Sequence, residues 1–219
     1  MGPEEFIQLW NPSIGKSNEL PVLQKLHHRH RVTYGFGYDS VTDNYKVVVI
    51  EKTQVKVHTL GTKFWKNIGD FPKATDHEQK SGKYVSGTIN WLAQRWPRSS
   101  PPFIVSFDLG NESYQEVLLP DNKEVNDNFM TLDVFADCLC MLCGHDIWLM
   151  KEYGNKESWT KLFTISYLEN PSMRYSLTKV SNGSQILVQY RTVVPGPLVS
   201  AEQWVLGLGR YRTIAPKAC

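Results

Sequence analysis

Apolar and polar residues alternate in two short runs within residues 147–165, IWLMKEYGNKESWTKLFTI. Alternation with a period of two is typical of a β-strand that has one face in the core, and it places Trp148 and Met150 on one face and Leu149 on the other. Between the runs, residues 153–157 contain the Gly and Asn that tight turns favour for left-handed backbone angles. The pattern therefore predicts an antiparallel hairpin.

The same succession of an alternating run, a turn and an aromatic residue recurs along the chain. Its copies begin at Ile7, Val55, Ile104, Ile147 and Trp204, which lie 43 to 57 residues apart. Each copy after the first follows another pair of alternating runs, so that the repeating unit has four strands. These pairs are residues 34–38 with 45–50, 84–86 with 89–93, 131–135 with 139–143, and 175–180 with 186–190. A four-strand unit at this interval predicts an all-β fold, a β-propeller-like (kelch-type) array of four-stranded antiparallel blades.

The repeats also set the expected domain limits. We expect a disordered N-terminus over residues 1–5, one propeller-like domain over residues 6–214 and a tail over residues 215–219. The copy at Ile7 lacks an inner strand pair, so we expect the array to be incomplete at the N-terminus and to leave a strand edge unpaired. The expected blades are residues 6–21 (partial), 34–69, 84–120, 129–165 and 174–214.

Loop length is distributed unevenly between the two faces of the expected array. The connections between first and second strands and between third and fourth strands are short, whereas the others are long. Long loops on one face of a rigid scaffold are typical of a binding surface, although added loop length is also simply tolerated at little cost. The long segments are residues 70–83, 95–102, 121–129, 166–174 and 191–203.

Five residues in or beside these loops are our candidates for binding a protein. Arg95, Trp96 and Arg98 share one segment, and Trp and Arg are the residue types most enriched at interface hot spots. The alternative is that Trp96 only anchors its loop. Arg174 and Arg191 flank the last inner strand pair, and we expect them to contribute to the same rim.

Composition excludes some classes of partner. With 41% hydrophobic residues the 219-residue chain can form a large core, and its 24 basic and 22 acidic residues leave a net charge of only +2. So small a charge predicts no binding to nucleic acid or to a membrane surface. The first residues, MGPEEF, do not have the pattern of a secretion signal, and we expect a cytoplasmic or nuclear location, or both.

Potential metal ligands occur in two groups. Cys138, Cys140, Cys143 and His145 have zinc-binding residue types, but strand alternation would point Cys140 and Cys143 to opposite faces, so we expect core cysteines. The histidines at residues 27, 28 and 30 are expected in a solvated loop. No metal and no cofactor is predicted.

Neither a nucleotide-binding nor a catalytic motif is recognisable. The segment YGFGYD, residues 34–39, has two glycines but not the third glycine or the helix of a dinucleotide-binding turn. Its glycines instead predict close packing of a first strand near the axis of the array. The chain contains neither a G-x-S-x-G nor an H-E-x-x-H motif, so we expect no enzyme activity.

Five segments, taken in order along the chain, carry motifs that are found together in one protein family. They are WNPSIGKSNELP (residues 10–21), YGFGYDSVTDNYKVV (34–48), YVSGTINWLA (84–93), FIVSFDLGNESYQEVLLP (103–120) and DIWLMKEYGNKESWTKLFTI (146–165). Together they resemble the F-box-associated interaction domain of plant F-box/kelch-repeat proteins. The resemblance extends over about residues 6–214.

The resemblance implies a role in protein ubiquitination. In this family an N-terminal F-box binds the Skp1-type adaptor of an SCF ubiquitin ligase, and the associated domain captures the target protein. The F-box is absent from this sequence. The resemblance therefore implies a non-catalytic substrate-recognition module, which would reach the adaptor only through an F-box outside this chain. The alternatives are a lectin-like carbohydrate-binding module and, less in keeping with the motifs, a propeller enzyme with a central pocket.

Overall fold

The computed structural model describes residues 7–23, 32–72, 76–77, 81–95, 100–120, 130–164, 174–179, 185–192 and 203–210. For residues 76–77 and for the last three segments it describes the backbone. The described secondary structure consists of antiparallel sheets and a single 3-10 turn, η1 (Lys156–Ser158). No helix in these ranges is long and apolar enough to cross a membrane.

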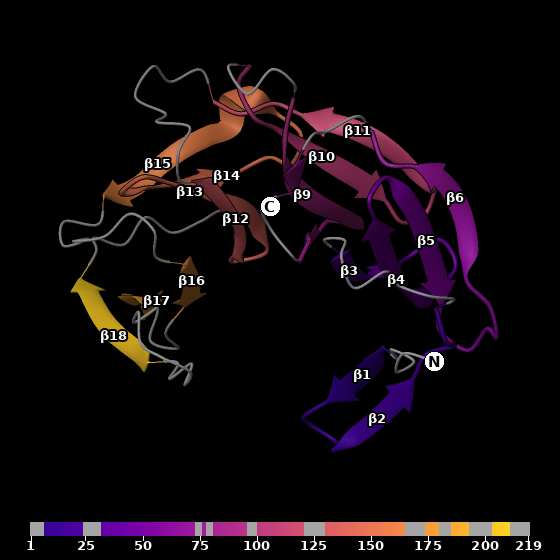
Figure 1. Ribbon diagram of the computed structural model, residues 1–219. Coiled ribbons are helices and arrows are strands. Elements are labelled where there is room, and N and C mark those ends of the chain that lie inside the picture. Colours follow the sequence, from indigo (N-terminus) through magenta and orange to yellow (C-terminus); the bar gives the residue numbers. More distant parts are fainter. Residues whose placement is uncertain are drawn as a thin grey trace, which may run out of the picture.

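Five sheets follow one another around an arc (Figure 1). The first contains β1 (Gln8–Asn11) and β2 (Lys16–Glu19), and the second contains β3 (Val32–Asp39), β4 (Asn44–Glu51), β5 (Gln54–Thr59) and β6 (Lys66–Asp70). The third contains β7 (Asp76–His77), β8 (Lys83–Val85), β9 (Thr88–Gln94), β10 (Phe103–Asp108) and β11 (Ser113–Val117). The fourth contains β12 (Met130–Phe135), β13 (Cys138–Cys143), β14 (Asp146–Met150) and β15 (Trp159–Thr164), and the fifth β16 (Arg174–Lys179), β17 (Gln185–Thr192) and β18 (Gln203–Arg210).

The predicted fold class is confirmed by these sheets. Strands that follow one another in sequence pair as neighbours within the second, fourth and fifth sheets, as in propeller blades. In Figure 1 the strands β3, β9, β12 and β16 lie toward the middle of the arc, whereas β6, β11, β15 and β18 lie toward its outside.

Two details differ from the prediction. The segment before β8, expected to be a loop, contributes β7, which pairs with the end of β9. The run that begins at Trp204 was expected to contain a turn, but β18 continues to Arg210 and pairs with β17 along its length, including Gly207 and Gly209. These two glycines therefore do not mark a turn, because glycine is tolerated within a strand.

The predicted hairpin of residues 147–165 is present. β14 pairs with β15 from Asp146 opposite Thr164 to Met150 opposite Trp159. The Asn155 side chain caps η1 in the connecting turn by accepting a hydrogen bond of 3.0 Å from the Glu157 N–H. Met150 packs in the core between the third and fourth sheets, whereas Leu149 packs in a separate cluster with Cys138 and Cys140, as alternation requires.

Glycines on β3 allow the second sheet to approach the third closely. A Cβ atom built on Gly35 would lie 2.7 Å from Ile89 Cγ2 and 2.8 Å from Trp91 Cζ2, and one on Gly37 would lie 2.8 Å from Leu109 Cδ1. Real Cβ atoms do not approach their neighbours so closely. The predicted role of these glycines in close packing near the axis is therefore confirmed.

Candidate protein-binding surface

Arg95 follows β9, at the end of the third sheet where the second-to-third strand connection begins. Its guanidinium Cζ lies 4.1 Å from the centre of the Phe103 ring, and its Nη2 forms an ion pair with Glu116 of β11. The side chain stays 46% exposed. The third sheet thus holds a cation at the protein surface.

The other predicted binding residues are distributed over different parts of the chain. Trp96 and Arg98 lie outside the described residues, as does most of the predicted long-loop face. Arg174 of β16 and Arg191 of β17 are direct register partners, so the fold brings these two positions together. They belong to the fifth sheet and Arg95 to the third. The described contacts of Arg95 with Phe103 and Glu116 are all within its own sheet.

The potential zinc ligands do not converge. Cys138, Cys140 and Cys143 are all buried in core clusters, which agrees with the expectation of core cysteines, and Cys140 and Cys143 are free thiols in different clusters. Burial raises the pKa of the Cys140 thiol well above its usual range. Within the described ranges no three His, Cys, Asp or Glu residues are grouped to hold a metal ion. The histidines at residues 27, 28 and 30 lie outside these ranges.

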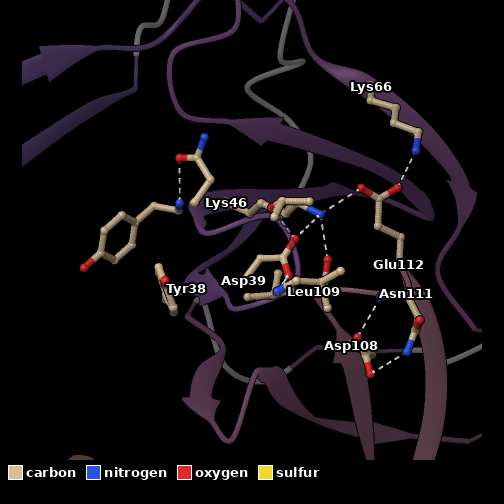
Figure 2. A network of polar contacts seen from close by, with 12 residues as sticks. Tyr38, Asp39, Lys46, Lys66, Asp108, Leu109, Asn111 and Glu112 are labelled. Atoms are coloured by element: carbon tan, nitrogen blue, oxygen red, sulfur yellow. Dashed lines mark hydrogen bonds and ion pairs between the residues drawn. The ribbon is translucent and has the colours of Figure 1, made fainter.

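A buried ion cluster, which the sequence analysis did not predict, joins the second and third sheets (Figure 2). Lys46 of β4 is 3% exposed and directs its ammonium group at three oxygen atoms. These are Asp39 Oδ2 at 2.9 Å, the Leu109 carbonyl at 2.7 Å and Glu112 Oε1 at 3.1 Å. The second oxygen of Glu112 accepts from the exposed Lys66 at 2.5 Å. All three ammonium protons of Lys46 therefore have an acceptor, as a buried charge requires.

The charges of the cluster stabilise one another. Burial alone would raise the pKa of Asp39, but hydrogen bonds from Thr42, Lys46 and Val41 outweigh burial and hold that pKa at about 2. Likewise, burial lowers the pKa of Lys46, but its bonds to Asp39 and Glu112 raise it overall. Both groups are consequently charged at neutral pH and have their partners, so the cluster is a structural clamp and does not have the features of a general acid or base.

A second polar cluster joins the third and fourth sheets. The Tyr153 hydroxyl, from the turn after β14, lies 2.7 Å from Thr88 Oγ1, 2.5 Å from Ser106 Oγ and 2.7 Å from Asn90 Oδ1. Thr88, Asn90 and Ser106 are all buried. In both clusters the turn between third and fourth strands of one sheet thus bonds to polar groups of the sheet before it. The only sign of either cluster in the sequence is a charged or polar residue within an apolar strand.

These sheets define an all-β scaffold of propeller type, in which close glycine packing and buried polar bonds join the second sheet to the third, and buried polar bonds join the third to the fourth. Residues 2–188 match the family described as the F-box associated beta propeller domain. An F-box/kelch-repeat protein of Arabidopsis thaliana is 31% identical over 204 residues, which cover 86% of this chain and 55% of that protein. The chain belongs to the F-box-associated β-propeller domain family.

Further comparisons agree with this membership. The F-box protein CPR1 of Arabidopsis thaliana is 30% identical over 197 residues, which cover 73% of this chain and 48% of that protein. The chain thus spans about half the length of these relatives. Among solved structures, TolB from Acinetobacter baumannii aligns over 94% of this chain and 46% of its own, with a TM-score of 0.51 and 12% sequence identity. At this identity the similarity concerns the fold alone.

Proposed function

We propose that this chain is the non-catalytic target-binding module of an SCF-type ubiquitin ligase receptor. Membership of the F-box-associated family is the observation that carries the proposal. Two further features support it: the sheets are bonded to one another through buried polar clusters, and Arg95 is presented at the surface. A scaffold of this kind can hold a binding surface in fixed geometry without any catalytic group.

The proposed target-binding surface consists of Arg95 with Trp96 and Arg98, extended by Arg174 and Arg191. Arg95 is paired with Glu116 and directly precedes Trp96 in the sequence. The target is a protein, and the Skp1-type adaptor would be bound through an F-box outside this chain. We also propose that the protein is located in the cytoplasm, the nucleus or both. Imaging of a fluorescent fusion of the full-length protein would test this location.

Quantitative affinity purification tests the proposal. The intact chain is compared with a variant in which Arg95, Trp96 and Arg98 are all replaced by Ala. A matched control replaces Trp10 and Lys16 of the first sheet, also an exposed Trp and a basic residue, by Ala. Proteins that the intact chain and the control retain, and that the triple variant loses, are then purified and titrated directly by calorimetry.

We expect the triple variant to bind such a protein at least about tenfold more weakly, because hot-spot Trp and Arg side chains each contribute more than about 1 kcal/mol. Equal binding by all three proteins would refute the proposed surface. If no protein bound the intact chain in a saturable manner, the proposed target-binding function would itself be wrong.

A further inference from the structure

The guanidinium of Arg95 keeps hydrogen-bond donors that no described residue uses. Its Nη2 donates to Glu116, and the side chain makes no other hydrogen bond within the described part of the chain. A guanidinium carries N–H donors on all three nitrogens, in a rigid fork that matches a carboxylate. The donors on Nε and Nη1 are therefore available to a further acceptor. The Phe103 ring, 4.1 Å from Cζ, and Glu116 together orient the group.

An exposed leucine lies close to this cation. Glu116 is 36% and Leu118 49% exposed, whereas Val117 between them is buried and Leu119 packs against the core between the third and fourth sheets. The alternation of β11 thus continues past its end and places Leu118 on the same side of the sheet as Glu116. The Leu118 carbonyl accepts a hydrogen bond of 3.0 Å from Trp159 Nε1 of β15, which holds the backbone at this point.

These side chains gather at one end of the third sheet. Arg95 follows β9, Phe103 begins β10 and Leu118 follows β11. Because Ile104 pairs with Val117, Leu118 comes next to the position opposite Phe103. A cation, the ring beneath it and an apolar side chain are thus neighbours across three strands. We call this set the third-sheet rim: Arg95, Phe103, Glu116 and Leu118.

The charge at the third-sheet rim favours an acidic partner. Residues 94–107 contain two arginines and no acidic residue, and Glu116 offsets one of these positive charges. The remaining positive charge attracts a carboxylate, whereas Glu116 repels a doubly charged phosphate more strongly than a singly charged carboxylate. The exposed Leu118 in turn favours an apolar side chain near that carboxylate, because contact removes both apolar surfaces from water.

We propose that the third-sheet rim binds a segment of the target protein in which a Glu or Asp lies close in sequence to a large apolar residue. The carboxylate accepts hydrogen bonds from Nε and Nη1 of Arg95, and the apolar side chain covers Leu118. Since Arg95 is already ordered over Phe103, little conformational entropy is lost when the carboxylate binds. The inference rests on the proposed target-binding function and adds the chemical class of the bound segment.

A peptide selection on the full chain tests the proposal. Random peptides displayed on phage are selected for binding, and we expect enrichment of sequences that combine an acidic with an apolar residue. The most enriched such peptide is labelled and titrated into the full chain, with fluorescence anisotropy as the readout. Replacement of its acidic residue by Gln should weaken binding at least about tenfold, and replacement by phosphoserine should also weaken it.

Variants of the protein then locate the binding site. We expect Arg95→Met to bind the peptide at least about tenfold more weakly and Leu118→Ser about threefold or more. Glu116→Gln should bind it about two- to fivefold more tightly, because Glu116 competes with the peptide carboxylate for Arg95. Lys161→Met, at the cation of another partly exposed ion pair, with Asp146, is the matched control and should bind normally.

Several outcomes would overturn the proposal. They are the absence of enriched acidic and apolar peptides, a preference for phosphoserine, equal binding by Arg95→Met, and unchanged or weaker binding by Glu116→Gln. The proposed function is judged separately by affinity purification. A target protein that requires Arg95 but binds equally well after its own acidic residues are replaced would uphold that function and overturn this inference alone.

Discussion

Replacement of Lys46 by Met should markedly destabilise the protein. Met keeps most of the volume of the side chain but removes the charge and its three bonds. Asp39, which is 1% exposed, would lose its cation, and the Leu109 carbonyl would lose its donor. An uncompensated buried charge is one of the few changes that costs several kcal/mol.

The magnitude follows from two estimates. The shift of the Asp39 pKa from 3.8 to about 2 corresponds to roughly 2 kcal/mol of folding free energy at neutral pH. Removal of one partner of a buried ion pair typically costs about 3–5 kcal/mol. Because Thr42 and Val41 would still bond to Asp39, we expect the lower end, about 3 kcal/mol. Met at position 46 together with Asp39→Asn should recover part of this loss.

Urea unfolding followed by tryptophan fluorescence at several pH values measures the effect. The folded-state pKa of Asp39 lies below its unfolded value, so its stabilisation is present above about pH 4 and is lost as the pH falls toward 2. The difference between the native protein and Lys46→Met should shrink over the same range. Lys66→Met, at the 62% exposed partner of Glu112, is the control and should cost less than about 1 kcal/mol. An equal cost for both variants, or a difference that does not change with pH, would refute the reasoning.

Three further predictions concern the packing between sheets and the buried thiols. Gly37→Ala should lower the free energy of unfolding by about 1–3 kcal/mol, because the added methyl group meets Leu109 and Tyr84; a normal urea midpoint would contradict this. Tyr153→Phe should cost about 1–3 kcal/mol in the same assay, because Asn90 and its neighbours lose a buried partner, whereas Tyr45→Phe should cost little. Iodoacetamide should modify Cys140 only after unfolding, as mass spectrometry of the native and urea-treated protein would show, and rapid native modification would contradict its burial.

Much of the architecture is encoded locally in the sequence. Alternation over residues 147–165 is sufficient to predict the hairpin of β14 and β15, because the side-chain period of a strand is a property of the backbone itself. Gly35 and Gly37 likewise indicate close packing, although not which residues they meet. Local signals also have limits: the two-residue turn at Ala136 and Asp137 has positive φ at both positions, 51° and 62°, without any glycine.

The contacts between sheets were decided only by the tertiary structure. Lys46 and Glu112 are 66 residues apart, and Tyr153 and Asn90 are 63 apart. No periodic pattern relates such positions, because their meeting depends on the register of several strands and on how each sheet stacks on the next. The exposure of Phe36, which lies opposite the buried Val47, is likewise a property of the assembled sheets. The local sequence determines each strand separately. Which side chains are buried and which charges pair is determined only when the strands pack together.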